Sequence, residues 1–318
     1  MKKIALEEHF TRPELSAYSH RPQSSLNSPI LRKFEARLLE FDSLRLEAMD
    51  EAGIDLAVLS VTTPGVQGEP DVNVAIKRAR EANDFLAREV RKRPTRYAGF
   101  AHLPLHDAKA AADELTRCVE QLGFKGAMIN GQTNGRYLDE RDYDVFWERV
   151  QALDAPIYLH PADPYDMPRM YEGHPELLGA TWSWTVETAT HALRLVFGGT
   201  FDRYPKATLI LGHMGETLPY LLWRLDSRSR IQQQGSQQEG RLPSDVIRKN
   251  IVITTTGVCS HPSLQCALSA LGEDSVMFSV DYPYEDCRVA AEFIETAPIS
   301  ERVRTKVCHG NAERVLHL

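Results

Sequence analysis

Several apolar segments of this sequence end in side chains that can bind a metal or move a proton. Glu7 and His9 end the first segment, His160 the fifth, His213 the sixth and Asp281 the eighth. If these segments are strands of one parallel barrel, their carboxyl ends meet at one mouth, where the side chains converge. Such a group of carboxylates and imidazoles is costly to bury unless a cation neutralises it. Mixed histidine and carboxylate ligation suits Zn²⁺ or Mn²⁺, so the pattern predicts a divalent-metal site.

Each of these residues also has an ordinary structural interpretation. A single histidine at a strand end is more often a hydrogen-bonded structural residue, Glu7 could pair with an arginine, and Asp281 could cap the following turn. Glu7 and His9 are two residues apart, so on a strand they point to the same side, with Glu8 on the other. Because the residues form one joint pattern, we interpret them as a single site.

The apolar segments recur at regular intervals and alternate with helical patterns. Most are almost entirely apolar, as strands covered on both faces are. The predicted strands are Ile4–His9, Leu56–Thr62, Tyr97–Pro104, Gly126–Asn130, Pro156–Pro161, Thr208–Met214, Ile251–Thr256 and Val276–Pro283. Apolar residues at helical spacing predict helices over Asp71–Lys92, Ala108–Leu122, Tyr143–Leu153, Glu187–Gly198 and Arg288–Thr296.

Alternation of buried strands with helices predicts an α/β protein with a parallel sheet. Eight such units fit a (β/α)8 TIM barrel better than an open doubly wound sheet, which would carry a glycine-rich phosphate turn. The sequence has no such turn, so no organic cofactor is expected. Residues 1–318 are interpreted as one domain with two insertions. Phe10 to Leu39 is expected to be a loop with a short helix over the top face, and Asp226 to Ser244 a polar surface excursion.

The composition excludes several classes of protein. The 318 residues are 42% hydrophobic and 25% charged, which is typical of a globular chain and not of a disordered or fibrous one. A net charge of -7 without basic runs argues against a nucleic-acid partner. No apolar stretch approaches the roughly 20 residues of a membrane span, and Glu7, Glu8 and His9 interrupt the N-terminal apolar stretch, so no signal peptide is expected. Five scattered cysteines without a Cys-x-x-Cys pair predict a reduced, cytoplasmic protein.

Four motifs resemble those of the amidohydrolase superfamily. They are Ile4–Phe10 (IALEEHF), Tyr158–Pro164 (YLHPADP), Leu209–Tyr220 (LILGHMGETLPY) and Phe278–Glu285 (FSVDYPYE). The resemblance is to the aminocarboxymuconate-semialdehyde decarboxylase-like branch, and most of all to the non-oxidative decarboxylases of γ-resorcylate (2,6-dihydroxybenzoate) or 2,3-dihydroxybenzoate. It covers essentially the whole chain. It implies an amidohydrolase-type barrel with loop insertions over the C-terminal face, and a homodimer or homotetramer.

The resemblance also implies which residues hold the metal. The ligands of the family correspond to Glu7, His9, His160 and Asp281. Hydrolytic members often carry a lysine at the end of the fourth strand, where it bridges two metals. Here that strand ends in Asn130, and Lys125 stands at its opposite end. A single divalent ion is therefore expected.

The reaction implied by the resemblance is the reversible decarboxylation of an ortho-hydroxylated benzoic acid, such as 2,6- or 2,3-dihydroxybenzoate or salicylate. The metal would anchor the substrate oxygens, and protonation of the ring carbon that bears the carboxylate would allow CO₂ to leave. Asp281 is expected to shuttle this proton, His213 to polarise the substrate or relay the proton, and Glu216 to orient the ring of His213. The residues with suggested substrate contacts are Arg224, which could offset substrate charge, and the aromatic Phe10, Trp182, Trp184 and Tyr282.

Two other interpretations remain open. The same ligands could activate water in a metal-dependent hydrolase or hydratase that acts on a ring or lactone carbonyl. Alternatively, the chain could be a non-catalytic barrel, with a metal that serves structure only. Structural metal sites are usually closed and rich in cysteine or histidine, so carboxylates at a barrel mouth favour catalysis.

Overall fold

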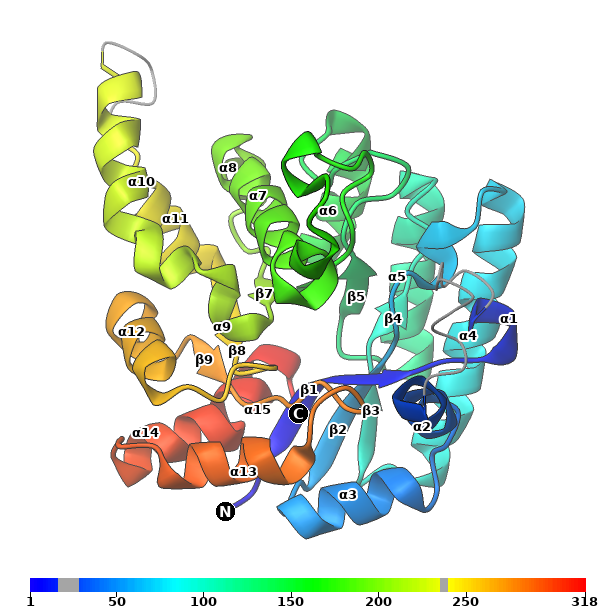
Figure 1. Ribbon diagram of the computed structural model, residues 1–318. Helices are drawn as coiled ribbons and strands as arrows, with labels where there is room; N and C mark the ends of the chain where they lie inside the picture. The colour runs from blue at the N-terminus through cyan, green and yellow to red at the C-terminus, as the bar shows by residue number, and fades with distance from the viewer. Residues whose placement is uncertain (17–28, 235–239) are drawn as a thin grey trace.

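Nine parallel strands lie at the centre of the computed structural model, which describes residues 1–16, 29–234 and 240–318 (Figure 1). They are β1 (Ile4–Phe10), β2 (Leu56–Val61), β3 (Tyr97–Gly99), β4 (Ala101–His102), β5 (Ala127–Asn130), β6 (Ile157–His160), β7 (Leu209–Leu211), β8 (Ile251–Thr254) and β9 (Val276–Met277). Their order is β1-β2-β3 in one sheet and β4-β5-β6-β7-β8-β9 in the other. Neighbours in sequence are therefore neighbours in space.

The two sheets together form one closed barrel. Only Phe100 separates β3 from β4, and its amide donates to the carbonyl of Leu59 at 2.9 Å. The predicted strand Tyr97–Pro104 is thus one barrel position with a short interruption. At the other seam, the amide of His9 donates to the carbonyl of Tyr282 at 2.7 Å. Eight strand positions result, and the predicted (β/α)8 barrel is confirmed.

Helices surround the strands (Figure 1). The α-helices are α1 (Pro13–Ser16), α2 (Pro29–Leu38), α3 (Leu44–Ala52), α4 (Val72–Lys92), α5 (Ala108–Leu122), α6 (Asp144–Leu153), α7 (Ser183–Phe197), α8 (Thr200–Arg203), α9 (His213–Glu216), α10 (Leu218–Gln232), α11 (Pro243–Asn250), α12 (His261–Leu271), α13 (Cys287–Thr296), α14 (Glu301–Thr305) and α15 (Asn311–Leu316). Short 3₁₀ helices are η1 (Gly65–Gly68), η2 (Arg141–Tyr143), η3 (Arg169–Tyr171), η4 (Pro175–Leu177) and η5 (Gly179–Thr181), and η6 (Lys306–Gly310) is a π-helix. None of the helices in these described ranges is long and apolar enough to cross a bilayer.

The five predicted helices are present, and side-chain caps explain several of their starts. Asp71 accepts hydrogen bonds from the amides of the first turn of α4, and Asp107 and Asp286 do the same for α5 and α13. An aspartate at this position satisfies amides that have no partner within the helix. The structure differs at α7, which begins at Ser183 rather than at Glu187.

A bulge in β1 decides which of its side chains face the inside of the barrel. Ile4 and Leu6 belong to the interior cluster, and Ala5 belongs to the layer between strands and helices. The pairing of β1 with β2 then shifts between Ala5 and Glu8, where β1 has one extra residue. A bulge of this kind reverses the alternation of faces. As a result, Glu7 and His9 reach the mouth of the barrel, and Phe10 packs in the outer layer.

Both predicted insertions need adjustment. Of Phe10 to Leu39, residues 17–28 lie outside the described part, and the rest contains α1 and α2 where a single short helix was predicted. The described residues of Asp226 to Ser244 are mostly exposed or half-buried, as a surface excursion requires, but the segment is helical at both ends, because α10 continues to Gln232 and α11 begins at Pro243. Arginine and glutamine are good helix formers, and proline suits the first position of a helix. Residues 235–239 lie outside the described part.

Candidate metal centre and active site

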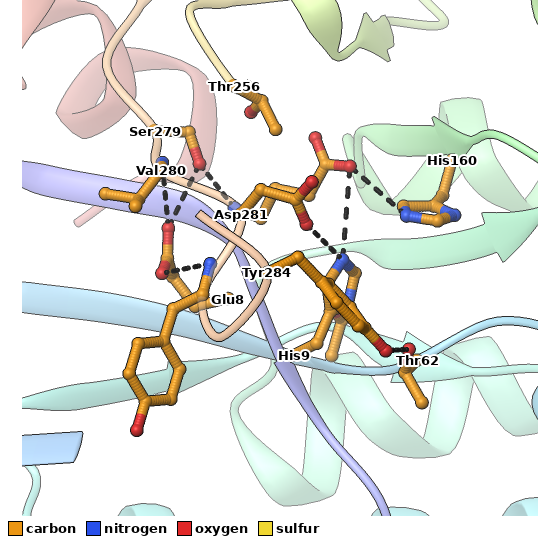
Figure 2. A network of polar contacts seen from close by, with 12 residues as sticks. Glu8, His9, Thr62, His160, Thr256, Ser279, Val280, Asp281 and Tyr284 are labelled. Carbon is orange, nitrogen blue, oxygen red and sulfur yellow. Dashed lines mark hydrogen bonds and ion pairs between the residues drawn. The ribbon is translucent and has the colours of Figure 1, made fainter. Parts of the chain in front are cut away.

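Four predicted ligand residues meet at the mouth of the barrel. Glu7 and His9 come from β1, His160 from the end of β6, and Asp281 from the segment after β9. One ligand atom from each lies within 4.8 Å of the others. The Nε2 of His160 is 3.3 Å from Glu7 Oε1, and the Nε2 of His9 is 3.3 Å from Asp281 Oδ1. Figure 2 shows His9, His160 and Asp281 turned toward this common point.

The atoms that face this point have no other partner in the described part of the chain. Glu7 Oε1, His9 Nε2 and Asp281 Oδ1 are buried and make no hydrogen bond. Buried polar groups without a partner are costly, and a cation that accepts their lone pairs would remove that cost. The donor set of two carboxylates and two imidazoles fits a divalent ion. The four residues can therefore hold a divalent ion.

The remaining atoms of these ligands are held by neighbouring groups. The hydroxyl of Tyr158 donates to Glu7 Oε2, His160 Nδ1 lies 2.7 Å from the carbonyl oxygen of Pro161, and His9 Nδ1 lies 3.2 Å from Ser60 Oγ. A histidine whose Nδ1–H is bonded to a carbonyl presents the lone pair of Nε2 to a metal. The outer partners therefore orient the ligands before any ion arrives.

Burial and neighbouring charges set the protonation of the cluster. Burial raises the pKa of Glu7, and burial together with the charge of His9 lowers the pKa of His160 well below its usual value. Burial would also raise the pKa of Asp281, but the neighbouring imidazoles of His213 and His9 lower it to about 2. A carboxylate at Asp281 and a neutral His160 are the forms that bind a metal.

His213 and Glu216 lie on a left-handed turn beside the cluster. After β7 the backbone has positive φ at every residue from His213 to Thr217. Non-glycine residues seldom adopt this conformation, and such strain is common at functional sites. The turn brings Nδ1 of His213 within 2.7 Å of Glu216 Oε1 and leaves its Nε2 3.9 Å from Asp281 Oδ2. Burial alone would lower the pKa of His213, but Glu216 and Glu7 raise it well above its usual value.

Gly212 occupies a position where a side chain would strike the cluster. A Cβ there would lie 2.6 Å from Glu7 Oε2 and 3.1 Å from the Tyr158 hydroxyl. We expect Gly212→Ala to lose about 1–3 kcal/mol of stability, the usual cost of overpacking, and to bind metal more weakly. Melting temperature and metal content measure these effects. Gly310→Ala is the control, because its Cβ would have no neighbour closer than 3.6 Å. Unchanged metal content and melting temperature in Gly212→Ala would contradict the prediction.

The aromatic surroundings differ from those predicted. Phe10 packs against Phe41 in the core, and Tyr282 is 2% exposed beneath the guanidinium of Arg45, 4.5 Å from its ring. Neither ring faces the cluster, because the bulge turns Phe10 outward and the residue after Asp281 points to the opposite side. Arg224 is exposed on α10, and the structure shows no contact of its side chain with the cluster within the described residues.

Other aromatic rings lie close to the ligands. The ring centroid of Trp184 is 6.3 Å from that of His160, and the centroid of Tyr284 is 5.9 Å from that of His9. The Tyr284 hydroxyl is 2.7 Å from Thr62 Oγ1 (Figure 2). Trp182 and Trp184 line a mainly apolar pocket of about 740 Å³ that opens beside His213.

Sequence reasoning does not assign roles to several of these groups. Tyr158 has a usable signal, because it stands two residues before His160 on the same strand and so shares its face. Ser60 carries a weaker signal, as a polar residue inside an apolar segment. Tyr284 lies within the motif Phe278–Glu285, but nothing in the sequence shows that its ring approaches His9.

Comparisons with known proteins agree with this geometry. The family described as amidohydrolase matches residues 27–318. A γ-resorcylate decarboxylase of Polaromonas sp. (strain JS666) is 44% identical, over 99% of this chain and 98% of that protein. The crystal structure of a 2,6-dihydroxybenzoate decarboxylase from Rhizobium has a TM-score of 0.92 at 42% identity, with 100% of this chain and 99% of that chain covered.

A further crystal structure shows a dihydroxybenzoic acid decarboxylase from Polaromonas sp. JS666 with bound manganese and the inhibitor 2-nitroresorcinol. Its TM-score is also 0.92, at 43% identity, and the match covers 100% of this chain and 97% of that chain. These likenesses run through the whole barrel and include the strands that carry the cluster. The chain belongs to the amidohydrolase family, in the group that contains the dihydroxybenzoate decarboxylases.

Proposed function

We propose that this protein is a metal-dependent, non-oxidative decarboxylase of benzoic acids with a hydroxyl ortho to the carboxylate, such as 2,6-dihydroxybenzoate. The relatives named above support this substrate class. The observation that carries the proposal is the position of Asp281, which faces the metal ligands through Oδ1 and His213 through Oδ2. A carboxylate shared between a metal site and an imidazole can both meet the substrate and move a proton.

The chain's own residues account for the movement of the proton. Asp281 rests as a carboxylate, so it can take the proton of the ortho-hydroxyl group as the substrate binds. It then delivers this proton to the ring carbon that bears the carboxylate, which gives a dienone. The bond from that carbon to the carboxylate breaks, its electron pair restores the aromatic ring, and CO₂ leaves. His213, which Glu216 orients and whose raised pKa keeps it protonated, gives its proton to the phenolate oxygen and regains one from water. A bound divalent ion would supply Lewis acidity and a template for the adjacent carboxylate and phenol oxygens.

We propose a single ion per chain, either Mn²⁺ or Zn²⁺. Manganese is supported by the related structure that contains it. The end of β5 carries Asn130, and Lys125 lies before that strand, where its Nζ donates to the carbonyl of His317. The position from which a lysine bridges two metals in hydrolytic relatives therefore holds an amide. This arrangement favours the decarboxylase over the two-metal hydrolase.

We place the substrate ring near Trp184 and Tyr284, with Trp182 at the rim of the pocket. Trp184 approaches His160, and Tyr284 approaches His9, so the two rings flank the ligands. Phe10 and Tyr282, which lie in the core, have no part in this proposal. Arg224 has none either, because its side chain is exposed on α10.

We also infer a homodimer or homotetramer. Tyr220 and Trp223 on α10 are 82% and 75% exposed, and Trp182 across the pocket is 47% exposed. Large aromatic side chains grouped on a surface favour association between subunits. Light scattering on the purified protein measures the state, and a monomer at micromolar concentration would contradict the inference.

A panel of substituted benzoic acids tests the proposed reaction. We expect 2-hydroxy-, 2,3-dihydroxy- and 2,6-dihydroxybenzoate to release CO₂, because an ortho-hydroxyl stabilises the dienone and is the only ring hydroxyl adjacent to the carboxylate, so that both groups would reach one ion. Benzoate, 3-hydroxy- and 4-hydroxybenzoate should release none. In deuterated water, one deuterium should replace the carboxylate, and high bicarbonate with a phenol should give ortho-carboxylation.

The same panel separates the alternatives. Comparable turnover of 3- or 4-hydroxybenzoate would remove the ortho requirement. Ring-opened or hydrated products without CO₂ would support the hydrolase or hydratase. Because the two kinds of reaction give different products, product analysis decides between them.

A further inference from the structure

Besides the backbone bond from His9 to Tyr282, side chains hold together the seam between the first and last strand positions of the barrel. In the described ranges β1 and β9 are not joined in a regular ladder. Instead, the amides of Leu6 and Glu7 both donate to Ser279 Oγ, at 3.1 and 2.7 Å. Glu7 on one side of this seam and Asp281 on the other are both ligands of the metal site. The geometry of the site therefore depends on how the seam is fixed.

The carboxylate of Glu8 lies inside this seam. It is 3% exposed and accepts a hydrogen bond from the amide of Val280 at 3.1 Å on Oε1, and one from the amide of Tyr282 at 3.2 Å on Oε2. Oε1 also accepts from Ser279 Oγ at 3.2 Å. Figure 2 shows Glu8 below Ser279 and Val280, at the opposite end of the network from His160. The two carboxylate oxygens of Glu8 thus accept hydrogen bonds from the backbone amides of the residues before and after Asp281.

The residue held in this way has an unfavourable backbone conformation. Asp281 has φ +92°, in the region that favours glycine. A conformation of this kind persists only where surrounding contacts enforce it. Tyr284 and Glu285 donate their amides to the carbonyl of Asp281, at 2.8 and 3.1 Å. Those two bonds fix the following turn, and the carboxylate of Glu8 fixes the residues before and after the strained one.

A buried arginine supports the same region from the other side of β1. Arg45 is 1% exposed, donates from Nη2 to the carbonyl of His9 at 2.5 Å, and lies over the ring of Tyr282 at 4.5 Å. Its positive charge acts on the carboxylate of Glu8. The backbone carbonyl of His9 is therefore held by Arg45, and the backbone amide of Tyr282 by Glu8.

We propose that Glu8 is a positioning residue that sets the place of Asp281 and, through Ser279, of Glu7 at the metal site. It touches neither ion nor substrate, and acts by fixing two ligand-bearing segments across the seam. The expected effect on turnover rests on the proposed decarboxylase function, whereas the expected effect on metal affinity does not. Groups that orient metal ligands typically change metal affinity or activity about 10–100-fold when they are replaced.

The test compares Glu8→Gln with Glu114→Gln in the full-length protein. Glutamine at position 8 keeps the size of the side chain but has one oxygen, so one of the two flanking amides loses its acceptor. Glu114 is another buried carboxylate, on the outer helix α5, where it accepts from Asn83 and Arg117. The protein is freed of metal and titrated with Mn²⁺ alone, and the melting temperature of each variant is recorded.

We expect Glu8→Gln to weaken Mn²⁺ binding by about 10–100-fold, and Glu114→Gln to stay within about twofold of the wild type even if it melts earlier. With substrate, Glu8→Gln should lower kcat more than it changes KM, because Asp281 is misplaced and the substrate pocket is intact. If Glu8→Gln does not fold, Glu8→Asp, which keeps the charge on a shorter side chain, is measured against the same criterion.

Wild-type Mn²⁺ affinity in the folded Glu8 variant would overturn the proposal. An equal loss of Mn²⁺ affinity in Glu114→Gln would also overturn it, because the weaker binding would then follow from lost stability of the fold. If the wild type binds Mn²⁺ but decarboxylates nothing, the proposed function fails while the Mn²⁺ titration still decides the role of Glu8.

Discussion

Asp281→Asn should abolish turnover while the barrel stays folded. Loss of a positioned acid or base typically lowers the rate by about 10²–10⁴-fold, and loss of a charged ligand should increase the deficit. Asparagine keeps the shape and one oxygen near His9 Nε2, which is 3.3 Å from Asp281 Oδ1. It cannot take the hydroxyl proton or deliver it to the ring carbon. Single-turnover CO₂ release at saturating Mn²⁺ measures the chemical step, and elemental analysis of the same sample reports the bound metal.

Asp286→Asn is the matched control for this variant. Asp286 stands five positions along the chain and caps α13 by accepting from the amide of Arg288. Asparagine caps a helix nearly as well as aspartate, so we expect activity close to that of the wild type. If Asp281→Asn held metal and kept a substantial share of wild-type kcat, Asp281 could not be the proton carrier.

Removal of the metal should eliminate activity and lower the melting temperature. The cluster then contains buried carboxylates and imidazoles whose inner atoms have no partner in the described structure, and such groups are costly to leave unsatisfied. A ligand present at 100 times its Kd stabilises the folded state by about 2.7 kcal/mol. The fall in melting temperature after exhaustive chelation therefore reports the same interaction that activity does.

Addition of metal after the chelator has been removed completes this experiment. We expect Mn²⁺ or Zn²⁺ to restore activity and melting temperature together, with about one ion bound per chain. The two carboxylates and two imidazoles within 4.8 Å offer ligands for one ion. A reproducible content near two ions, or full activity without metal, would refute the single-ion site.

The strand positions of the barrel and the residues that gather at its mouth can be predicted from the sequence. Buried strands of a barrel appear in the sequence as apolar segments. A polar side chain at the carboxyl end of such a segment is expected to lie at the mouth of the barrel. Glu7, His9, His160 and Asp281 satisfy this rule, and the structure brings all four together. The family's motif identifies His213 and Glu216, and the left-handed turn after β7 places them in contact.

The errors concern side chains that directly follow a predicted ligand. Phe10 follows His9 and is predicted to contact substrate, but it lies on the opposite face of β1 and packs in the outer layer. Tyr282 follows Asp281, and its ring lies beneath Arg45 instead of facing the cluster. Successive residues of an extended chain point to opposite sides, so a motif of adjacent residues does not bring all of its side chains into one site.

The barrel, the family and the candidate ligand residues can be recognised in the sequence, because each follows from local periodicity or from short motifs at strand ends. How the candidate ligands are held follows from contacts between distant parts of the chain. In the sequence, Glu8 cannot be told apart from any other carboxylate within an apolar segment. Its proposed role depends on hydrogen bonds from backbone amides more than 270 positions away in the chain. Contacts across the seam of a closed barrel join its first and last strands, so no pattern within either strand can reveal them.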